Sequence, residues 1–138
     1  MLDPSAVTVL IADDDPDARD SLGKVLELML PGVRTVFAVD GLDAVSVALD
    51  ICPWAVILDL GMPRMDGLDA AQRLQARMGK EMPILIAASG DYKRLRESYD
   101  VFDYSLRKPI DLPRLARYLA RAMVFASDGQ AARQTRPD

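Results

Sequence analysis

The residues of this chain that are best suited to chemistry are aspartates that end two apolar segments. Asp13–Asp15 end the first segment, and Asp59 ends the second. Asp15 suits helix capping, because a carboxylate there satisfies free backbone N–H groups and complements the helix dipole. If Asp13, Asp14 and Asp59 lie together, their like charges disfavour one another unless a cation neutralises them. Mg²⁺, with Mn²⁺ as a substitute, prefers such oxygen ligands.

Two further polar residues follow apolar segments nearer the C-terminus. Lys108 precedes Pro109, which restricts the lysine backbone to extended geometry, and its ammonium group can act as a point charge for a phosphate. Ser89, followed by Gly90, can donate its hydroxyl to a phosphoryl oxygen. Each residue taken alone also has a plain explanation, Lys108 as a surface lysine and Ser89 as a turn residue.

These positions can meet because apolar segments alternate with helical patterns along the chain. The pattern predicts strands at Val7–Ala12, Arg34–Ala38, Ala55–Leu58, Ile84–Ala87 and Tyr104–Leu106, and helices at about Ala18–Met29, Leu42–Leu49, Leu68–Met78, Tyr92–Tyr99 and Leu112–Met123. Such alternation favours a parallel sheet with helices on both faces. Ligands bind beyond the carboxyl ends of the strands in such sheets, so the candidate residues are expected to converge there.

Length and composition indicate the number of domains and argue against several classes of function. With 138 residues, half of them apolar, the chain is predicted to form one domain over residues 1–125, followed by a disordered polar tail over 126–138. The net charge of −4 argues against direct nucleic-acid binding. The apolar runs are too short for membrane insertion, the N-terminus does not resemble a secretory signal, and the single cysteine, Cys52, fits the cytoplasm. Since the sequence has no histidine, a histidine-ligated metal or a Ser-His-Asp triad is excluded on this chain.

Four segments together resemble the receiver domain of two-component response regulators. They are Ile11–Pro16, Leu58–Gly67, Ser89–Gly90 and Lys108–Pro109. The second segment carries the pattern Asp-x-x-Met-Pro-x-Met-Asp-Gly, which is highly specific. The resemblance covers Val7–Val124 and implies a flavodoxin-like (βα)5 α/β fold, a three-layer sandwich around a parallel sheet of strand order 2-1-3-4-5.

The resemblance also implies a role for each candidate residue. Asp59 would accept a phosphoryl group from a sensor histidine kinase or a phosphotransfer protein, which would switch contact with a downstream protein target that the sequence does not identify. The chain would then be a signalling protein rather than a metabolic enzyme. The implied Mg²⁺ ligands are Asp13 (directly or through water), Asp14, Asp59 and the carbonyl of Gly61, and the implied phosphoryl-binding residues are Ser89 and Lys108.

The chain departs from the family between Ser89 and Lys108, a stretch that is shorter than usual by about one helical turn. A shift of one residue would place Ala88, instead of Ser89, at the family's hydroxyl position. The aromatic residue that usually stands three positions before the lysine is replaced by Ser105. Tyr104, one position earlier, is the alternative candidate for the switch role.

Two competing functions follow from these departures. The first is a degenerate receiver that binds a partner without being phosphorylated. The second is a hydrolase of the haloacid-dehalogenase type, which also uses a strand-end aspartate and Mg²⁺. That family needs a second acid two residues after its nucleophile, and the residue at that place here is Gly61. The hydrolase is therefore the weakest of the three hypotheses.

Overall fold

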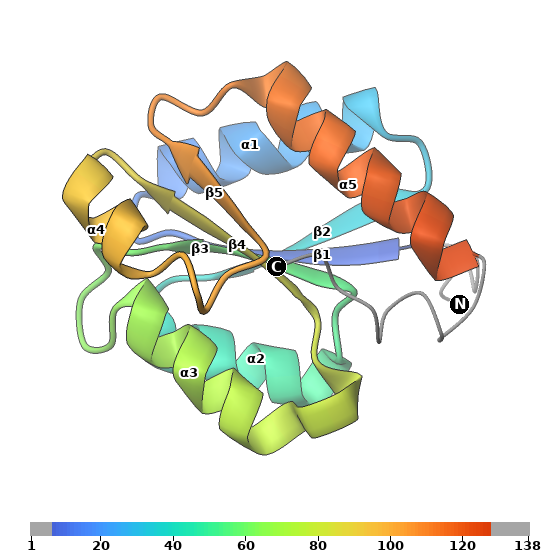
Figure 1. Cartoon of the computed structure of the whole chain (residues 1–138). Coiled ribbons are helices and arrows are strands. Elements are labelled where there is room, and N and C mark those ends of the chain that lie inside the picture. Colours follow the sequence, from blue (N-terminus) through green and yellow to red (C-terminus); the bar gives the residue numbers. More distant parts are fainter. Residues whose placement is uncertain (1–6, 128–138) are drawn as a thin grey trace.

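The computed structural model describes residues 7–127, in which strands and helices alternate as predicted (Figure 1). The strands are β1 (Val7–Ala12), β2 (Val33–Ala38), β3 (Ala55–Asp59), β4 (Ile84–Ser89) and β5 (Tyr104–Arg107). The helices are α1 (Pro16–Met29), α2 (Gly41–Ile51), α3 (Gly67–Met78), α4 (Tyr92–Glu97) and α5 (Leu112–Ser127), with a 3-10 turn, η1, at Gly79–Glu81. Within this part of the chain, no helix has the length and the apolar character needed to cross a bilayer.

The five strands form one parallel sheet in the order β2-β1-β3-β4-β5. Helices α1 and α5 cover one face of the sheet, and α2 and α3 cover the other (Figure 1). The flavodoxin-like fold and the strand order predicted from the sequence are therefore confirmed. The central strands are continuous apolar runs because helices bury both of their faces.

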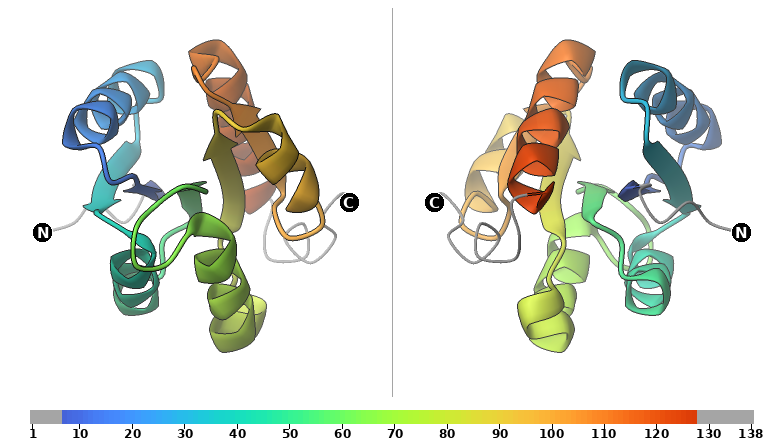
Figure 2. Two further views of the ribbon diagram at one scale, coloured as in Figure 1. Left: turned by 90° about the vertical axis from the view of Figure 1, so that its left-hand side faces the viewer. Right: turned by 90° about the vertical axis from the view of Figure 1, so that its right-hand side faces the viewer.

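Alternate residues of each strand face the two sides of the sheet, and this alternation divides the core in two. Leu10, Val56 and Leu85 belong to the cluster beneath α2 and α3. Val9 and Ile57 belong to the cluster beneath α1 and α5. The helix layers that cover the two clusters lie on opposite sides of the sheet (Figure 2). Each fully buried aliphatic side chain stabilises the fold by about 1.5–3 kcal/mol.

Aspartates cap the first turns of α1 to α5 and fix where each helix begins; in α5 the Arg114 N–H donates to Asp111 Oδ1 at 3.0 Å. Asp15, Asp40, Asp66 and Asp91 accept hydrogen bonds from backbone N–H groups in the first turns of α1, α2, α3 and α4. Each cap contributes about 1 kcal/mol. The predicted capping role of Asp15 is confirmed.

The observed boundaries differ from the predicted ones by a few residues. Strand β4 extends to Ser89, and α4 ends at Glu97, two residues before the predicted end. Helix α5 continues to Ser127, two residues past the end of the predicted domain at residue 125, and the domain division itself stays a prediction. The rest of the predicted disordered tail lies outside the described residues.

Candidate functional site

Asp13, Asp14 and Asp59 lie together at the carboxyl ends of β1 and β3. One carboxylate oxygen from each residue can be chosen so that all three atoms lie within 4.8 Å of one another. Asp13 is buried, Asp59 is half-buried and Asp14 is exposed, so the cluster opens to solvent on one side. The convergence predicted from the strand ends is thus present in the structure.

Lys108, which follows β5, bridges two of these carboxylates. Its Nζ donates to Asp59 Oδ2 at 3.0 Å and to Asp13 Oδ2 at 3.2 Å. Burial alone would lower the pKa of Lys108, but the hydrogen bonds and charges of Asp59 and then of Asp13 outweigh it, and the pKa is raised. The lysine backbone is also held in place, because its N–H donates to the Ser89 carbonyl at 2.9 Å.

The surroundings of Asp13 disfavour its charged form. Burial raises its pKa above the ordinary value, and this outweighs the N–H of Asp15, which donates to Oδ1 at 2.9 Å, and the charge of Lys108. The charge of Asp59 adds to the increase. A cation bound among these groups would relieve that unfavourable charge, and three carboxylates with an open side fit a Mg²⁺ ion that keeps several water ligands.

Two glycines give Asp59 its position. A Cβ on Gly67, the first residue of α3, would lie 2.5 Å from the Asp59 carbonyl oxygen, so only glycine allows the helix to begin this close to β3. The Gly61 N–H donates to Asp59 Oδ1 at 3.0 Å. Both glycines belong to the segment that carried the resemblance, and their packing explains why that segment contains them.

The strand register identifies which β4 residue lies beside Asp59. Asp59 pairs with Ala88, and Ala88 belongs to the same buried cluster as Ile57, two residues before Asp59. Ser89 points to the opposite face because successive strand residues alternate. Its Oγ accepts a hydrogen bond from the Asp91 N–H at 3.0 Å, at the start of α4. The structure therefore brings Lys108 to the acidic cluster and places Ala88, not Ser89, next to Asp59.

Register also separates the two candidates for the switch role. Tyr104 packs with the cluster beneath α1 and α5, and its ring stacks on Tyr118 of α5. Ser105 pairs with Ala87, which belongs to the opposite cluster together with Leu95 of α4. The position that faces α4 is consequently occupied by Ser105.

Hydrogen bonds and an ion pair connect the loop between β3 and α3 to the neighbouring β2–α2 loop. The Gly41 N–H donates to the Met65 carbonyl at 3.0 Å, and Arg64 Nε donates to Asp40 Oδ2 at 2.6 Å. The N–H of Asp43, and with it Arg64, lowers the pKa of Asp40. Arg64 has a left-handed backbone (φ 63°), which costs a non-glycine residue about 1–2 kcal/mol, so its ion pair holds a strained conformation in place.

Arg94 of α4 also reaches this loop, a contact that the sequence did not indicate. Its Nη1 donates to the Leu60 carbonyl at 3.2 Å. In the sequence, Arg94 is one of several charged residues between Lys93 and Glu97, and a run of this kind usually forms a solvated helix face. The signal in the sequence is its position four residues after Gly90, in the first turn of the predicted helix that follows the site.

The strand order, the acidic cluster and the strand-end lysine define a receiver-type signalling domain. A family model described as "Response regulator receiver domain" matches residues 9–120, and the chain belongs to this family. It is a family of signalling domains rather than of metabolic enzymes.

Relatives and solved structures agree with this assignment. The chain is 36% identical over 85 residues to "Response regulator MprA" of Mycobacterium sp. (strain KMS), a match that covers 62% of this chain and 36% of the relative. It therefore spans about a third of the length of the curated relatives that it matches. The "response regulator receiver domain (CheY-like) from Methylobacillus flagellatus" has a TM-score of 0.78 at 28% identity, covering 86% of this chain and 99% of that one. CheY4 of Vibrio cholerae, at 22% identity over 85% of this chain and 98% of its own, shares the fold with a TM-score of 0.74.

Proposed function

We propose that this chain accepts a phosphoryl group on Asp59 and thereby switches its contact with a partner protein. The observation that carries the proposal is the Lys108 ammonium, which lies 3.0 Å from Asp59 within a cluster of three carboxylates. A nucleophilic carboxylate beside a fixed cation is the arrangement that phosphoryl transfer requires, because the protein contributes mainly positioning and charge stabilisation.

In the proposed reaction, an Asp59 carboxylate oxygen attacks the phosphorus of the donor. A new O–P bond forms while the bond between phosphorus and the donor group breaks, and the leaving group takes the bonding electrons. With a phosphohistidine donor the leaving group is the imidazole, and with acetyl phosphate it is acetate. Lys108 offsets the charge that develops on the peripheral oxygens.

The carboxylates of Asp13, Asp14 and Asp59 and the carbonyl of Gly61 would hold Mg²⁺, for which Mn²⁺ could substitute. The ion would supply positive charge at the phosphoryl oxygens when bound. Asp13 supports this role, because burial raises its pKa and a cation bound beside it would favour its charged form. Ala88 would stand at the family's hydroxyl position, and Ser89 would contribute its backbone carbonyl to the placement of Lys108.

The partners follow from the chemistry. The donor would be a sensor histidine kinase or a phosphotransfer protein in the cytoplasm, since this chain has no histidine of its own to phosphorylate. Its output would be a protein–protein contact, because its net charge of −4 does not suit direct nucleic-acid binding.

A labelling experiment tests the proposal. The chain is incubated with acetyl phosphate and Mg²⁺, and its intact mass is measured. We expect a gain of one phosphoryl group that depends on Mg²⁺ and is absent from Asp59→Asn, while the matched variant Asp66→Asn, at the start of α3, still labels. Failure of the wild type to label, or labelling of Asp59→Asn, would contradict the proposal.

A degenerate receiver is the second candidate, and two specific observations favour it. The β4 residue beside Asp59 is an alanine, and the residue facing α4 on β5 is a serine. Such a chain would bind its partner through a fixed surface. It would show no phosphoryl gain in the same experiment and would bind its partner equally well as wild type and as Asp59→Asn.

A further inference from the structure

We infer that Arg94 is a second phosphoryl-binding cation, which contacts the phosphoryl group on Asp59 from α4. This inference rests on the proposed function, because it concerns the phosphorylated form of Asp59. It assigns a role to a residue outside the segments that resemble the family, and it adds a direct connection between the site and α4.

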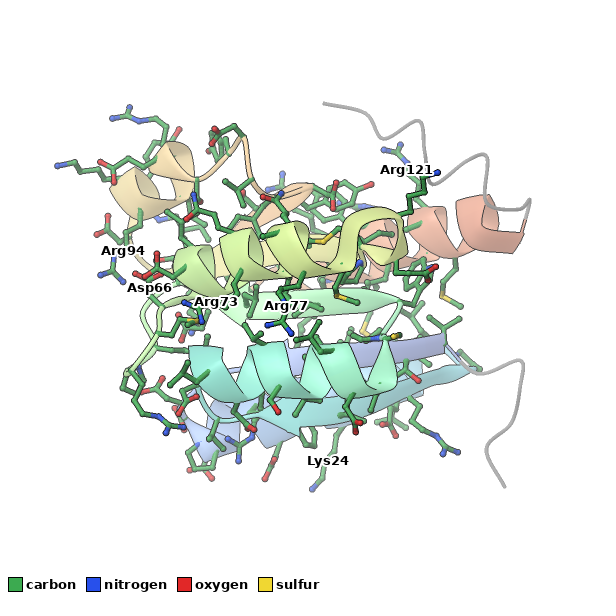
Figure 3. All side chains as sticks on the ribbon, turned by 90° about the horizontal axis from the view of Figure 1, so that it is seen from below. Lys24, Asp66, Arg73, Arg77, Arg94 and Arg121 are labelled. Atoms are coloured by element: carbon green, nitrogen blue, oxygen red, sulfur yellow. The ribbon has the colours of Figure 1, made fainter. Side chains whose placement is uncertain are left out.

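The geometry places the Arg94 guanidinium beside the acceptor carboxylate. Its Nη1 donates to the Leu60 carbonyl at 3.2 Å, one residue after Asp59. A Cβ built on Gly61 would lie 3.2 Å from Arg94 Nη1 and 3.8 Å from Asp59 Oδ1. Arg94 Nη1 and Asp59 Oδ1 therefore both lie within 4 Å of the position that a Gly61 side chain would take. Figure 3 shows Arg94 at this end of the molecule, where Asp66 caps α3.

The absence of a side chain at Gly61 leaves that space open. A phosphoryl group on Asp59 adds peripheral oxygens that extend outward from the carboxylate, and any that point toward Gly61 approach Arg94. The guanidinium has five N–H donors in a planar fork, so it can keep its bond to the Leu60 carbonyl and also donate to a phosphoryl oxygen.

Charge supplies the second argument. The phosphoryl group carries several strong acceptor oxygens and close to two negative charges. Lys108 approaches from β5, on the side of Asp13. On β4, the neighbour of Asp59 is Ala88, which has no hydroxyl to donate. Arg94 is thus the residue placed to supply a donor that β4 does not.

The backbone of α4 holds Arg94 in position. Asp91 Oδ1 caps the helix by accepting from the N–H groups of Lys93 and Arg94, and Leu95 is buried against the sheet. Arg96, by contrast, lies over the Tyr92 ring, with its Cζ 5.7 Å from the ring centroid. The same helix therefore offers a matched control, an exposed arginine that is directed elsewhere.

The consequence concerns how phosphorylation is sensed. A bond from Arg94 to the phosphoryl group would tie α4 to the β3–α3 loop more tightly than the Leu60 carbonyl alone does. That link would report the state of Asp59 to α4 without an aromatic side chain at Ser105.

The test measures the affinity of the chain for beryllofluoride (BeF3⁻), a stable phosphoryl analogue, by calorimetric titration in the presence of Mg²⁺. We expect Arg94→Gln to weaken binding about tenfold, the usual effect of losing one charge-assisted hydrogen bond. Arg94→Lys, which keeps the charge but loses the fork, should weaken it less, and Arg96→Gln should bind as the wild type does. Thermal unfolding of each variant confirms that it is folded.

A double-mutant cycle adds a measurement specific to the geometry. In Gly61→Ala the new methyl group would lie against both Arg94 Nη1 and Asp59 Oδ1, so it should weaken binding more in the wild-type background than in Arg94→Gln. Equal affinities of wild type and Arg94→Gln would overturn the inference while leaving the proposed function intact. If the wild type neither binds beryllofluoride nor labels with acetyl phosphate, the proposed function fails and the role of Arg94 fails with it.

Discussion

Tyr104 on β5 stacks against Tyr118 on α5, with ring centroids 4.3 Å apart and an angle of 13° between the ring planes. In this stack the Tyr104 side chain packs on the α5 face of the sheet. The residue that faces α4 is Ser105, whose short side chain cannot move an aromatic ring into or out of the core. Any signal that passes from Asp59 to the surface of α4 must therefore use other contacts.

The stack should contribute measurably to stability. Double-mutant cycles on stacked aromatic pairs give about 0.5–1.5 kcal/mol beyond the burial of each ring. We expect a coupling in this range between Tyr104→Leu and Tyr118→Leu, measured by urea unfolding. The control cycle pairs Tyr104→Leu with Tyr99→Leu, which lies beyond the end of α4, and it should give additive effects. Additive effects in the first cycle would show that the stack contributes nothing of its own.

Gly41 should tolerate no side chain. A Cβ at this position would lie 2.0 Å from the Met65 carbonyl oxygen, so Gly41→Ala must separate the β2–α2 and β3–α3 loops. We expect Gly41→Ala to lower the free energy of unfolding by about 3 kcal/mol or more, in the range of severe steric substitutions. Gly90→Ala is the control, because a Cβ there has no atom within 4 Å, and it should cost less than about 1 kcal/mol. Similar losses in both variants would contradict the close approach.

The metal-free protein should lose stability relative to Asp13→Asn as the pH rises. The pKa of Asp13 is raised in the fold, so between its ordinary value of 3.8 and the folded pKa the native state binds more protons at this residue than the unfolded state does. Unfolding free energy therefore falls as the pH increases through the folded pKa. The free energy of unfolding of both proteins is measured by urea unfolding without Mg²⁺. We expect Asp13→Asn to become more stable relative to the wild type as the pH rises over that interval.

Glu27 supplies a control with the opposite sign. The hydroxyl and the N–H of Thr35 donate to its carboxylate at 2.6 and 2.9 Å and lower its pKa below the ordinary value of 4.5. Its stabilising contribution is present above that value and is lost as the pH falls through the folded pKa. The wild type should therefore gain stability relative to Glu27→Gln as the pH rises. If the stability difference from the wild type changes with pH in the same direction for Asp13→Asn and Glu27→Gln, the different surroundings of the two carboxylates do not cause the pH dependence.

Mg²⁺ should stabilise the fold through the acidic cluster. A ligand present at about 100 times its Kd raises the free energy of unfolding by about 2.7 kcal/mol. We expect Asp14→Asn to remove most of this effect, because Asp14 belongs to the cluster while Lys108 bonds only to Asp13 and Asp59 among the three carboxylates. Asp17→Asn, which changes an exposed acid in the first turn of α1, should retain it. Thermal unfolding with and without Mg²⁺ makes the comparison, and equal stabilisation of all three proteins would exclude this site.

The sequence was sufficient to predict the fold and the acidic centre of the site. Strands that are buried on both faces, such as Ala55–Leu58, are continuous runs of apolar residues. Such a run is visible in a short stretch of sequence, so the strand can be predicted without the structure. Topology then brings Asp13, Asp59 and Lys108 together, because parallel strands share one carboxyl edge. Helix ends were less predictable, since the caps that decide them compete with packing.

The details that depend on register could not be predicted. A shift of one residue exchanges the two faces of a strand, and the choice between Ala88 and Ser89, or between Tyr104 and Ser105, is a shift of that kind. Arg94 was missed for a different reason. Its contact with Leu60 spans 34 residues and depends on where α4 lies relative to the β3–α3 loop, which no local pattern encodes.

The β3–α3 loop is held at Leu60 by Arg94, at Arg64 by Asp40 and at Met65 by Gly41. Fixing the backbone of a free loop residue costs about 1–2 kcal/mol of conformational entropy. The three contacts, all made by groups of the protein itself, offset that cost. Binding at the site therefore needs little rearrangement of the segment that carries Gly61, and the affinity of a ligand reflects its contacts rather than the work of ordering the loop.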